Sequence, residues 1–292
     1  MTDIAVNPPI VRRRKRGLTR KHSPFKAVLA IAFSALLIFF FASPVVWIYF
    51  ASFKPSAALI GTGTEGLGFT LDNYRNVWKN DFGRFMFNSL FICGISVIIS
   101  TAIAVCASYV LSRYRFAYKK WLFGFLVLTQ IFPWIVMMTP LFIMFAQLDL
   151  INNRFAIIFC YVTITLPFSI YLMVGYLEAL PRDIDEAALM DGCSRLQTMR
   201  HIILPLLAPG IVATATYSFL LMWTEFLLAL ALLTKTSMKT LPLGLALFFG
   251  EDTVDWGAVM AASALTTLPA LLLFLPVQSR LVAGLSAGSV KG

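Results

Sequence analysis

Charged residues are scarce in this chain of 292 residues. Only 13% of them are Asp, Glu, Lys or Arg, whereas 59% are hydrophobic. A soluble globular domain of this length needs more charged surface than this to cover its core. The composition therefore excludes an ordinary soluble fold and indicates an integral membrane protein.

Several kinds of site are also missing from the sequence. No GxxxxGK[ST] phosphate-binding loop occurs, so the chain does not hold ATP by that device. The four cysteines form no CxxC pair, and His22 and His201 lack the spacing of metal ligands. No nucleophile–base pair or pair of carboxylates stands at a catalytic spacing. We therefore predict no catalytic residue, metal site or cofactor on this chain.

Long stretches without charge are abundant instead. Six of them are long enough to cross the core of a bilayer, which takes about 20 residues of helix. They are Val28–Phe50, Phe85–Ser112, Trp121–Leu148, Phe155–Leu177, Ile202–Thr224 and Gly257–Ser279. The fifth continues past Glu225 to about Leu233. Because helices satisfy their own backbone groups in lipid, we predict an all-α integral membrane protein with six transmembrane helices.

The distribution of Lys and Arg predicts the orientation of these helices. Residues 1–27, 113–120, 178–201 and the C-terminus together hold 17 of them, whereas the alternate loops hold 7. Basic residues concentrate on the cytoplasmic side of a membrane. Both termini and the loop after the fourth stretch are therefore predicted to be cytoplasmic. The basic run near the N-terminus is explained by topology and attraction to anionic lipid, without a nucleic-acid partner.

A polar segment lies between the fourth and fifth stretches. Two capping-box patterns, Asp183 with Glu186 and Ser194 with Gln197, each predict the start of a short helix. Gly192 lies between them, where a left-handed glycine can end the first helix and form an elbow. The segment is therefore predicted to be a helical hairpin.

The same segment has the spacing EAA-x3-G-x9-I-x-L-P. Its members are Glu186, Ala187, Ala188, Gly192, Ile202, Leu204 and Pro205. This spacing resembles the cytoplasmic coupling loop of the membrane subunit of bacterial ABC importers. Weaker elements in the same order resemble the carbohydrate-uptake branch, closest to the second permease of maltose-type importers. They include Asn88-Ser89, Tyr109 with Ser112-Arg113, Leu166-Pro167, Trp223 before Glu225, and the C-terminal sequence GLSAGSVKG.

The resemblance implies a six-span permease of the type I ABC importer kind in the bacterial cytoplasmic (inner) membrane. Its parts are a basic N-terminal tail (1–27), a permease domain (28–282) with a coupling loop (178–205), and a C-terminal tail (283–292). The implied partners are a second homologous permease, two ATPase subunits that bind ATP and Mg²⁺, and an extracytoplasmic sugar-binding protein. The implied cargo is a sugar, expected to be a di- or oligosaccharide.

The resemblance also implies roles for residues of the coupling loop. Glu186 is expected to anchor the contact with the ATPase, Ala187 and Ala188 to allow close approach, and Gly192 to form the elbow. Asp191, Ile202, Leu204 and Pro205 complete the expected coupling set. In the C-terminal tail, Gly288, Val290 and Lys291 are expected to reach the ATPase, with a disordered end as the alternative.

Two polar residues within the stretches raise separate hypotheses. Glu225 is expected to lie in the bilayer, either in the pathway or outer gate, or as a structural carboxylate bonded to a neighbouring helix. Gln130, near Pro133, either lines a cavity or belongs to a kinked helix whose backbone is repaired locally. No residue of this chain is assigned to sugar binding.

The sequence allows two alternative functions. A stand-alone secondary transporter would show internal repeats and ionisable groups within the membrane, and only Glu225 fits the second requirement. An importer for another polyol or for glycerol phosphate is the other alternative. An anionic cargo favours basic residues in the pathway, and none lies within the six stretches, although a partner could supply them.

Single cysteines in a background without the four native ones test the orientation. In intact cells, Gly61→Cys and Thr236→Cys should react with a membrane-impermeant thiol reagent, because both positions are predicted to face outward. Ser194→Cys should react only after the membrane is opened. Labelling of Ser194→Cys in intact cells would reverse the predicted topology.

Overall fold

The structure, a computed structural model, describes residues 24–61, 68–250 and 254–288. Contacts divide the chain into two units, Met1–Trp47 and Ile48–Gly292, which are described separately. The described residues form helices joined by turns and loops, with one isolated bridge between Phe249 and Val254. The predicted all-α class is confirmed.

Helix α1 (Pro24–Ser52) contains the first predicted span and begins in the first unit. Pro44 lies inside this helix and has no N–H to donate to the carbonyl of Phe40, four residues earlier. The hydroxyl of Ser43 donates a hydrogen bond to that carbonyl at 3.0 Å. The freed backbone group is therefore satisfied locally, as a helix in lipid requires.

The second unit contains the other five spans. Three are continuous helices: α4 (Phe82–Arg113), α7 (Arg154–Glu178) and α14 (Trp256–Gly288). Two are bent pairs of helices, so the six predicted spans correspond to four continuous helices and two broken ones. Shorter helices lie between them: α2 (Ser56–Ile60), α3 (Asp72–Lys79), α12 (Leu227–Leu232), η3 (Thr236–Met238) and α13 (Leu241–Ala246).

The third span is bent beside Pro133. It consists of α5 (Lys119–Ile131), η1 (Trp134–Met137) and α6 (Met138–Gln147), with a bend of 84°. Pro133 causes the break, because proline disfavours helical backbone in the residue before it, and Phe132 is extended. The bend lies where the sequence suggests a kinked helix near Gln130.

The fifth span is also a bent pair of helices. Its second member, α11 (Ala208–Trp223), is bent by 73° from the segment Arg195–Leu206. That segment consists of α9 (Arg195–Thr198), the π-helix η2 (Met199–Ile203) and α10 (Leu204–Leu206). Pro205 and Pro209 flank the bend and remove backbone donors there. The predicted start of the span, Ile202, lies within the first member of the pair.

A row of small residues runs along one face of α4. Ser96, Ser100, Ala104, Ser108 and Ser112 recur at every fourth position and are completely buried. This spacing places them on one side of the helix. Small side chains allow close approach between helices in membranes, and α7 and α11 are the spans that pack along α4.

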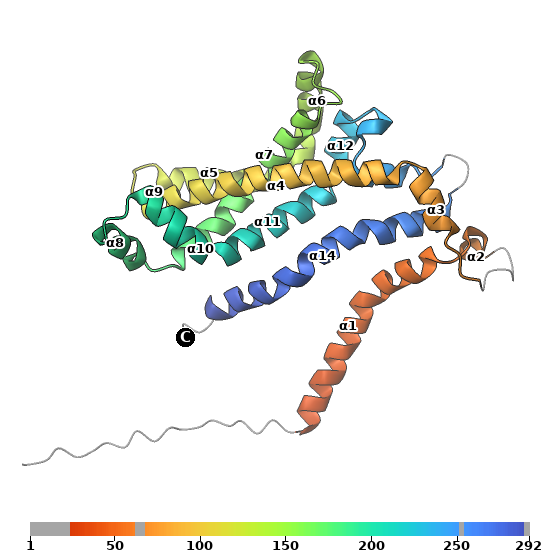
Figure 1. Cartoon of the computed structure of the whole chain (residues 1–292), viewed down its shortest axis with the longest axis horizontal. Coiled ribbons are helices and arrows are strands. Elements are labelled where there is room, and N and C mark those ends of the chain that lie inside the picture. Colours follow the sequence, from red (N-terminus) through yellow and green to blue (C-terminus); the bar gives the residue numbers. More distant parts are fainter. Residues whose placement is uncertain (1–23, 62–67, 251–253, 289–292) are drawn as a thin grey trace, which may run out of the picture. The chain divides into compact units, whose positions relative to one another are not determined.

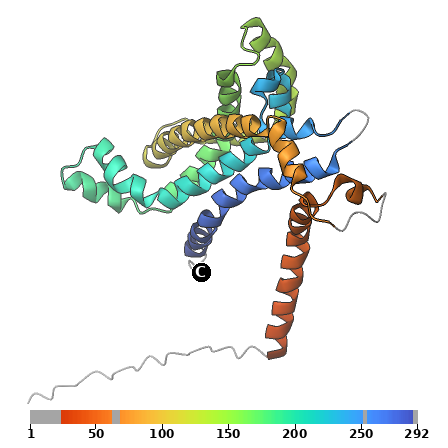
Figure 2. The ribbon, with the colours of Figure 1, turned by 45° about the vertical axis from the view of Figure 1, so that its right-hand side comes forward.

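Two apolar cores lie along the bundle. One contains Phe82 and Phe85 from the start of α4, and the other contains Val105 from near its end with Ile203 and Leu207. The second core adjoins α8 (Asp183–Met190). Figures 1 and 2 show α8 and α9 at one end of α4, and α2 and α3 at the other. The hairpin with α8 and α9 and the region with α2 and α3 therefore lie at opposite ends of α4.

The two predicted tails lie partly outside the described residues. Residues 1–23 of the basic tail, and Val290 and Lys291 of the C-terminal tail, are not among them. Helix α14 continues to Gly288, beyond the predicted boundary at residue 282. No proline interrupts the helix over this stretch.

The contact between α11 and α7 can be tested at Gly210. A Cβ atom at this position would lie 2.6 Å from Cγ of Tyr176, so Gly210→Ala should destabilise the chain by about 1–3 kcal/mol through overpacking. Gly175→Ala is the matched control, since no atom lies within 4 Å of its added Cβ. The melting temperature of the solubilised chain should fall for Gly210→Ala only. Equal melting temperatures for both variants would contradict the close packing.

Candidate functional site

The polar segment forms a hairpin of two helices joined at Gly192. Gly192 has the left-handed conformation that the elbow requires, with φ of +85°. Its N–H donates to the carbonyl of Leu189 at 3.1 Å, and the N–H of Cys193 donates to that of Ala188 at 3.0 Å. These two bonds form a Schellman motif, which ends α8 and satisfies its last carbonyls.

The second arm of the hairpin begins with a complete capping box. The hydroxyl of Ser194 accepts a hydrogen bond from the N–H of Gln197, and the Gln197 side chain accepts one from the N–H of Ser194. The first predicted capping box was wrong. Helical backbone already begins at Arg182, and Asp183 is the first residue of α8, without a capping hydrogen bond.

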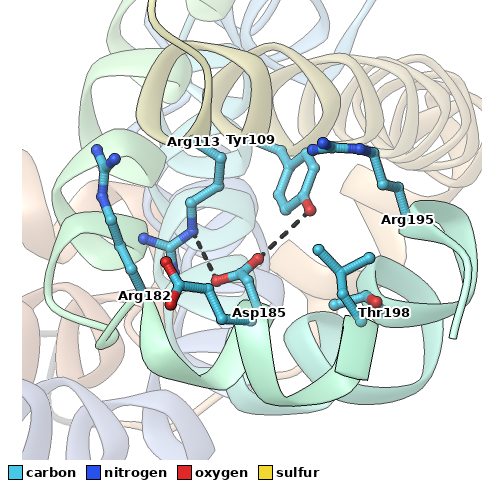
Figure 3. Close-up of a pocket in the computed structure, with 8 residues that line it drawn as sticks. Tyr109, Arg113, Arg182, Asp185, Arg195 and Thr198 are labelled. Atoms are coloured by element: carbon cyan, nitrogen blue, oxygen red, sulfur yellow. Dashed lines mark hydrogen bonds and ion pairs between the residues drawn. The ribbon is translucent and has the colours of Figure 1, made fainter. Parts of the chain in front are cut away.

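A buried ion pair joins α8 to the end of α4. Nε of Arg113 lies 3.0 Å from Oδ2 of Asp185, and the two side chains are only 7% and 14% exposed. The hydroxyl of Tyr109, one turn earlier on α4, donates to Oδ1 of Asp185 at 3.4 Å. Figure 3 shows both α4 side chains directed at the same carboxylate. Asp185 is thus held from two positions on α4.

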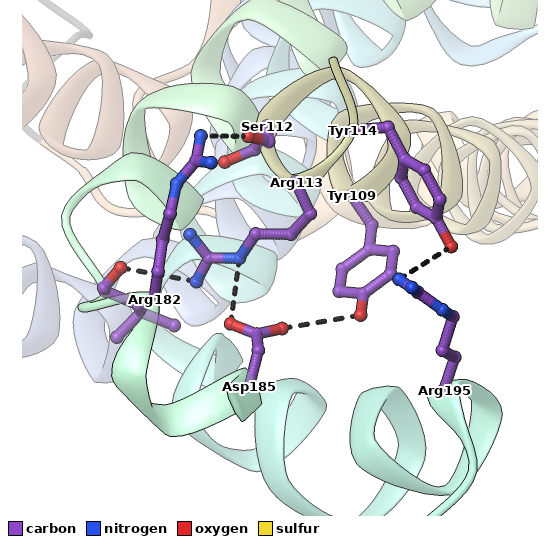
Figure 4. Close-up of polar contacts among 8 residues, drawn as sticks. Tyr109, Ser112, Arg113, Tyr114, Arg182, Asp185 and Arg195 are labelled. Carbon is purple, nitrogen blue, oxygen red and sulfur yellow. Dashed lines mark hydrogen bonds and ion pairs between the residues drawn. The ribbon is translucent and has the colours of Figure 1, made fainter. Parts of the chain in front are cut away.

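Three further contacts join the hairpin, and the segment just before it, to the end of α4 (Figure 4). The Arg182 guanidinium donates to the carbonyl of Ser112 at 2.9 Å, and that of Arg113 donates to the carbonyl of Leu180 at 3.2 Å. On the second arm, Arg195 lies over the ring of Tyr114, 5.2 Å from its centre. Both arms of the hairpin are therefore attached to the end of the second span.

The hairpin presents part of the predicted coupling set to the outside. Glu186, Ala187, Asp191 and Gly192 are exposed, whereas Ala188 is buried within this chain and only 3% exposed. Ala187 is therefore the alanine available to a partner, and Ala188 packs inside its own chain. Glu186 also lines a cavity of about 220 Å³ beside the ion pair.

The remaining members of the set lie at the base of the hairpin. Ile202 and Leu204 are partly buried, and Leu204 packs against the adjoining apolar core. Pro205 is exposed beside the bend. Ile203, which the spacing pattern skips, is completely buried in the core. The base thus anchors the hairpin to the bundle.

Two large apolar residues are exposed beside the elbow. Met190 is 88% exposed and Leu196 is 74% exposed. Neither was among the residues predicted from the sequence, because single apolar residues in a short helix usually mark its buried face. With Leu189, which is 40% exposed, they are the large apolar side chains on the exposed surface of the hairpin.

Glu225 lies at the end of α11 and is 9% exposed. Its carboxylate accepts hydrogen bonds from the N–H groups of Leu228 at 2.8 Å and Ala229 at 3.1 Å, at the start of α12. It also accepts one from the hydroxyl of Tyr161 on α7 at 3.1 Å. The carboxylate therefore satisfies backbone donors at the broken end of the fifth span and joins it to a neighbouring helix.

Gln130 lies at the break in the third span. With Thr129 it lines a cavity of about 260 Å³ that is also bordered by Thr163 and Pro167 of α7. Glu225 does not line this cavity. Leu228, whose N–H donates to the Glu225 carboxylate, does line it, so the two residues considered for the pathway are linked through Leu228.

Comparison with known proteins identifies the family to which this chain belongs. The family described as the binding-protein-dependent transport system inner membrane component matches residues 100–286. The chain belongs to this family. It is therefore a membrane-embedded permease subunit of a transport system that depends on a binding protein, and the alternative of a stand-alone secondary transporter is excluded.

Relatives of this permease have names that refer to sugar transport. The diacetylchitobiose uptake system permease of Streptomyces coelicolor is 34% identical over 93% of this chain and 100% of the relative. The trehalose/maltose transport system permease of Thermococcus litoralis is 34% identical over 91% of this chain and 98% of the relative. The predicted family, the permeases of carbohydrate-uptake ABC importers, is confirmed.

Solved structures confirm the fold of the permease. A chain from a bacterial ABC transporter involved in the import of the acidic polysaccharide alginate matches with a TM-score of 0.74 at 23% identity. The match covers 88% of this chain and 98% of that chain. A second structure, of an alginate ABC transporter in complex with a periplasmic protein, matches with a TM-score of 0.63 at 16% identity.

The contacts of Glu225 favour its structural role and generate a prediction. Glu225→Gln replaces one acceptor oxygen by a donor that faces backbone N–H groups, so it should destabilise the chain by about 1–3 kcal/mol. Tyr161→Phe removes only one of the three donors and should have a smaller effect. The measurement is the amount of folded chain recovered from membranes. Wild-type recovery of Glu225→Gln with altered transport would support a pathway role instead.

Proposed function

We propose that this permease is one of two homologous subunits that together import a di- or oligosaccharide. An extracytoplasmic binding protein delivers the sugar, and two cytoplasmic ATPase subunits bind ATP and Mg²⁺ and drive transport. The observation that carries this proposal is the exposed hairpin α8–α9, which is attached to the end of α4 and presents Glu186 and Ala187 outward.

The surface of the hairpin suits a protein partner. Ala187 allows another surface to approach α8 closely, and Glu186 supplies a polar anchor beside it. Met190 and Leu196 add exposed apolar side chains whose burial by a partner stabilises the complex. Asp191 and Gly192 complete the exposed turn between the arms.

The attachment of the hairpin explains how an ATPase moves the spans. The hairpin is continuous with α7 on one side and with α11 on the other, and it is attached to α4 by the contacts of Asp185 and Arg182. A rigid-body movement of the ATPase surface therefore shifts the ends of three packed helices together. Alternating access of the pathway follows from that movement.

The cargo is proposed from the relatives and from the charge of the spans. The relatives in Streptomyces and Thermococcus are named for diacetylchitobiose and for trehalose and maltose. The uncharged stretches of this chain contain no basic residue to pair with an anionic cargo. Both observations favour a neutral di- or oligosaccharide over glycerol phosphate.

The elbow provides the main test of the coupling role. Gly192→Val forces a β-branched residue into left-handed backbone, at a cost of about 1–2 kcal/mol or more. Nothing lies within 4 Å of an added Cβ, so the effect is confined to the backbone of the hairpin. The chain should insert and assemble normally. Uptake and the stimulation of ATP hydrolysis by loaded binding protein should fall together in the reconstituted complex.

Two further variants complete this experiment. Gly192→Asn is the matched control and should retain most activity, because asparagine tolerates left-handed backbone. Glu186→Ala keeps the helix and removes one anchor, so it should reduce stimulation more mildly than Gly192→Val. Full stimulation in a well-assembled Gly192→Val complex would contradict the coupling role of the hairpin.

A further inference from the structure

Helix α8 is attached at both ends and along its inner side. At its C-terminus, the left-handed Gly192 and two backbone hydrogen bonds form the turn into the next arm. At its N-terminus, residues 179–182 connect it to α7. Along its inner side, Ala188 is buried, Ile184 packs against the adjoining apolar core, and Asp185 pairs with Arg113.

The ion pair with Arg113 is the contact on this side that joins two charged side chains. It is the most buried ion pair among the described residues, since the other two, Arg75–Asp72 and Arg84–Asp81, are at least half exposed and each joins neighbours on one helix. Buried charge pairs contribute little net stability compared with apolar packing, but breaking one leaves a buried charge without a partner. Such a pair is therefore better suited to fix an orientation than to stabilise the fold.

The acidic residues at the start of α8 have different surroundings. Asp183 is exposed and makes no ion pair within the described part of the chain, whereas Glu186 is exposed and lines the cavity beside the ion pair. The carboxylate of Asp185 is contacted by both Arg113 and Tyr109 of α4 (Figures 3 and 4). Of these three carboxylates, only that of Asp185 is paired with α4 among the described residues.

We propose that Asp185 is a positioning residue that transmits movement of the ATPase to the second span through Arg113. The inference rests on the proposed function of the hairpin. It assigns the contact through which movement of α8 reaches α4. Without the pair, α8 can still dock on the ATPase through its outward face. Its displacement is then taken up by rotation of α8 and reaches α4 only in part.

The test uses the whole importer reconstituted in liposomes, with the loaded binding protein. Asp185→Asn keeps the shape of the side chain and removes its charge, so ATPase co-purification and unstimulated hydrolysis should remain near wild type. Stimulation by the binding protein, and uptake, should fall by roughly 5-fold or more, the usual range of coupling between distant sites. Asp185→Glu, which keeps a carboxylate, should recover a substantial part of the stimulation.

Asp183→Asn is the matched control. It removes the same charge from the same helical turn, where both aspartates interact favourably with the helix dipole. Because Asp183 has no partner on α4, this variant should keep wild-type stimulation. Equal losses in Asp183→Asn and Asp185→Asn would overturn the proposal, since the helix dipole would then explain both.

A double variant keeps the proposal testable if Asp185→Asn assembles poorly. Arg113→Gln/Asp185→Asn buries no unpaired charge and keeps a donor for the carbonyl of Leu180, so assembly should return. Stimulation should stay low, because the charged contact is still missing. Restored assembly with wild-type stimulation would overturn the proposal and leave the pair a stabilising role only.

The outcome for Gly192→Val separates this inference from the proposed function. If Gly192→Val loses stimulation and Asp185→Asn keeps it, the hairpin couples but Asp185 does not transmit, and only the present inference fails. If both variants keep full stimulation, the hairpin itself is not the coupling element.

Discussion

The close packing along α4 is the constraint on which the rest of the second unit depends. Its buried face carries a small residue at every fourth position from Ser96 to Ser112, which lets α7 and α11 pack along it. Lipid supplies no hydrophobic driving force between helices, so van der Waals contact over such a face has to hold the bundle together. Ser112, the last member of the row, also accepts the hydrogen bond of Arg182.

The polar hairpin is attached at the end of this row of small residues. The apolar core at this end includes Ile203 and Leu207 from the base of the hairpin, and the ion pair of Arg113 with Asp185 lies beside it. The elbow at Gly192 gives the second arm a separate direction without disturbing this attachment. Attachment of one arm and a sharp elbow before the other are the two features that the proposed coupling role requires.

Hydrophobic runs and local motifs predicted much of this architecture. All six spans lie where the uncharged stretches placed them, because length and apolarity are properties of local sequence. The left-handed Gly192 and the capping box of Ser194 and Gln197 are local as well. Two of the six are bent, beside Pro133 and between Pro205 and Pro209, because proline interrupts the helix although the composition remains apolar.

Contacts between distant segments could not be predicted in this way. Arg113 and Asp185 lie in separate elements, and no spacing rule indicates that they meet. The burial of Ala188, the exposure of Met190 and the three donors around Glu225 also follow from tertiary packing. The sequence pattern thus identified the hairpin, whereas the structure identified which of its residues are buried and which are exposed.

In the proposed mechanism, the first arm of the hairpin and the second span move as one body. Spin labels at Met190 on α8 and at Ile98 on α4, both exposed, measure the distance between them in the reconstituted importer with and without bound ATP analogue. If α8 and α4 move together, this distance should change by less than about 2 Å, the scale of small shifts between packed helices. A change of about 5 Å, close to one helical turn, would show that α8 slides on α4 and would contradict their joint movement.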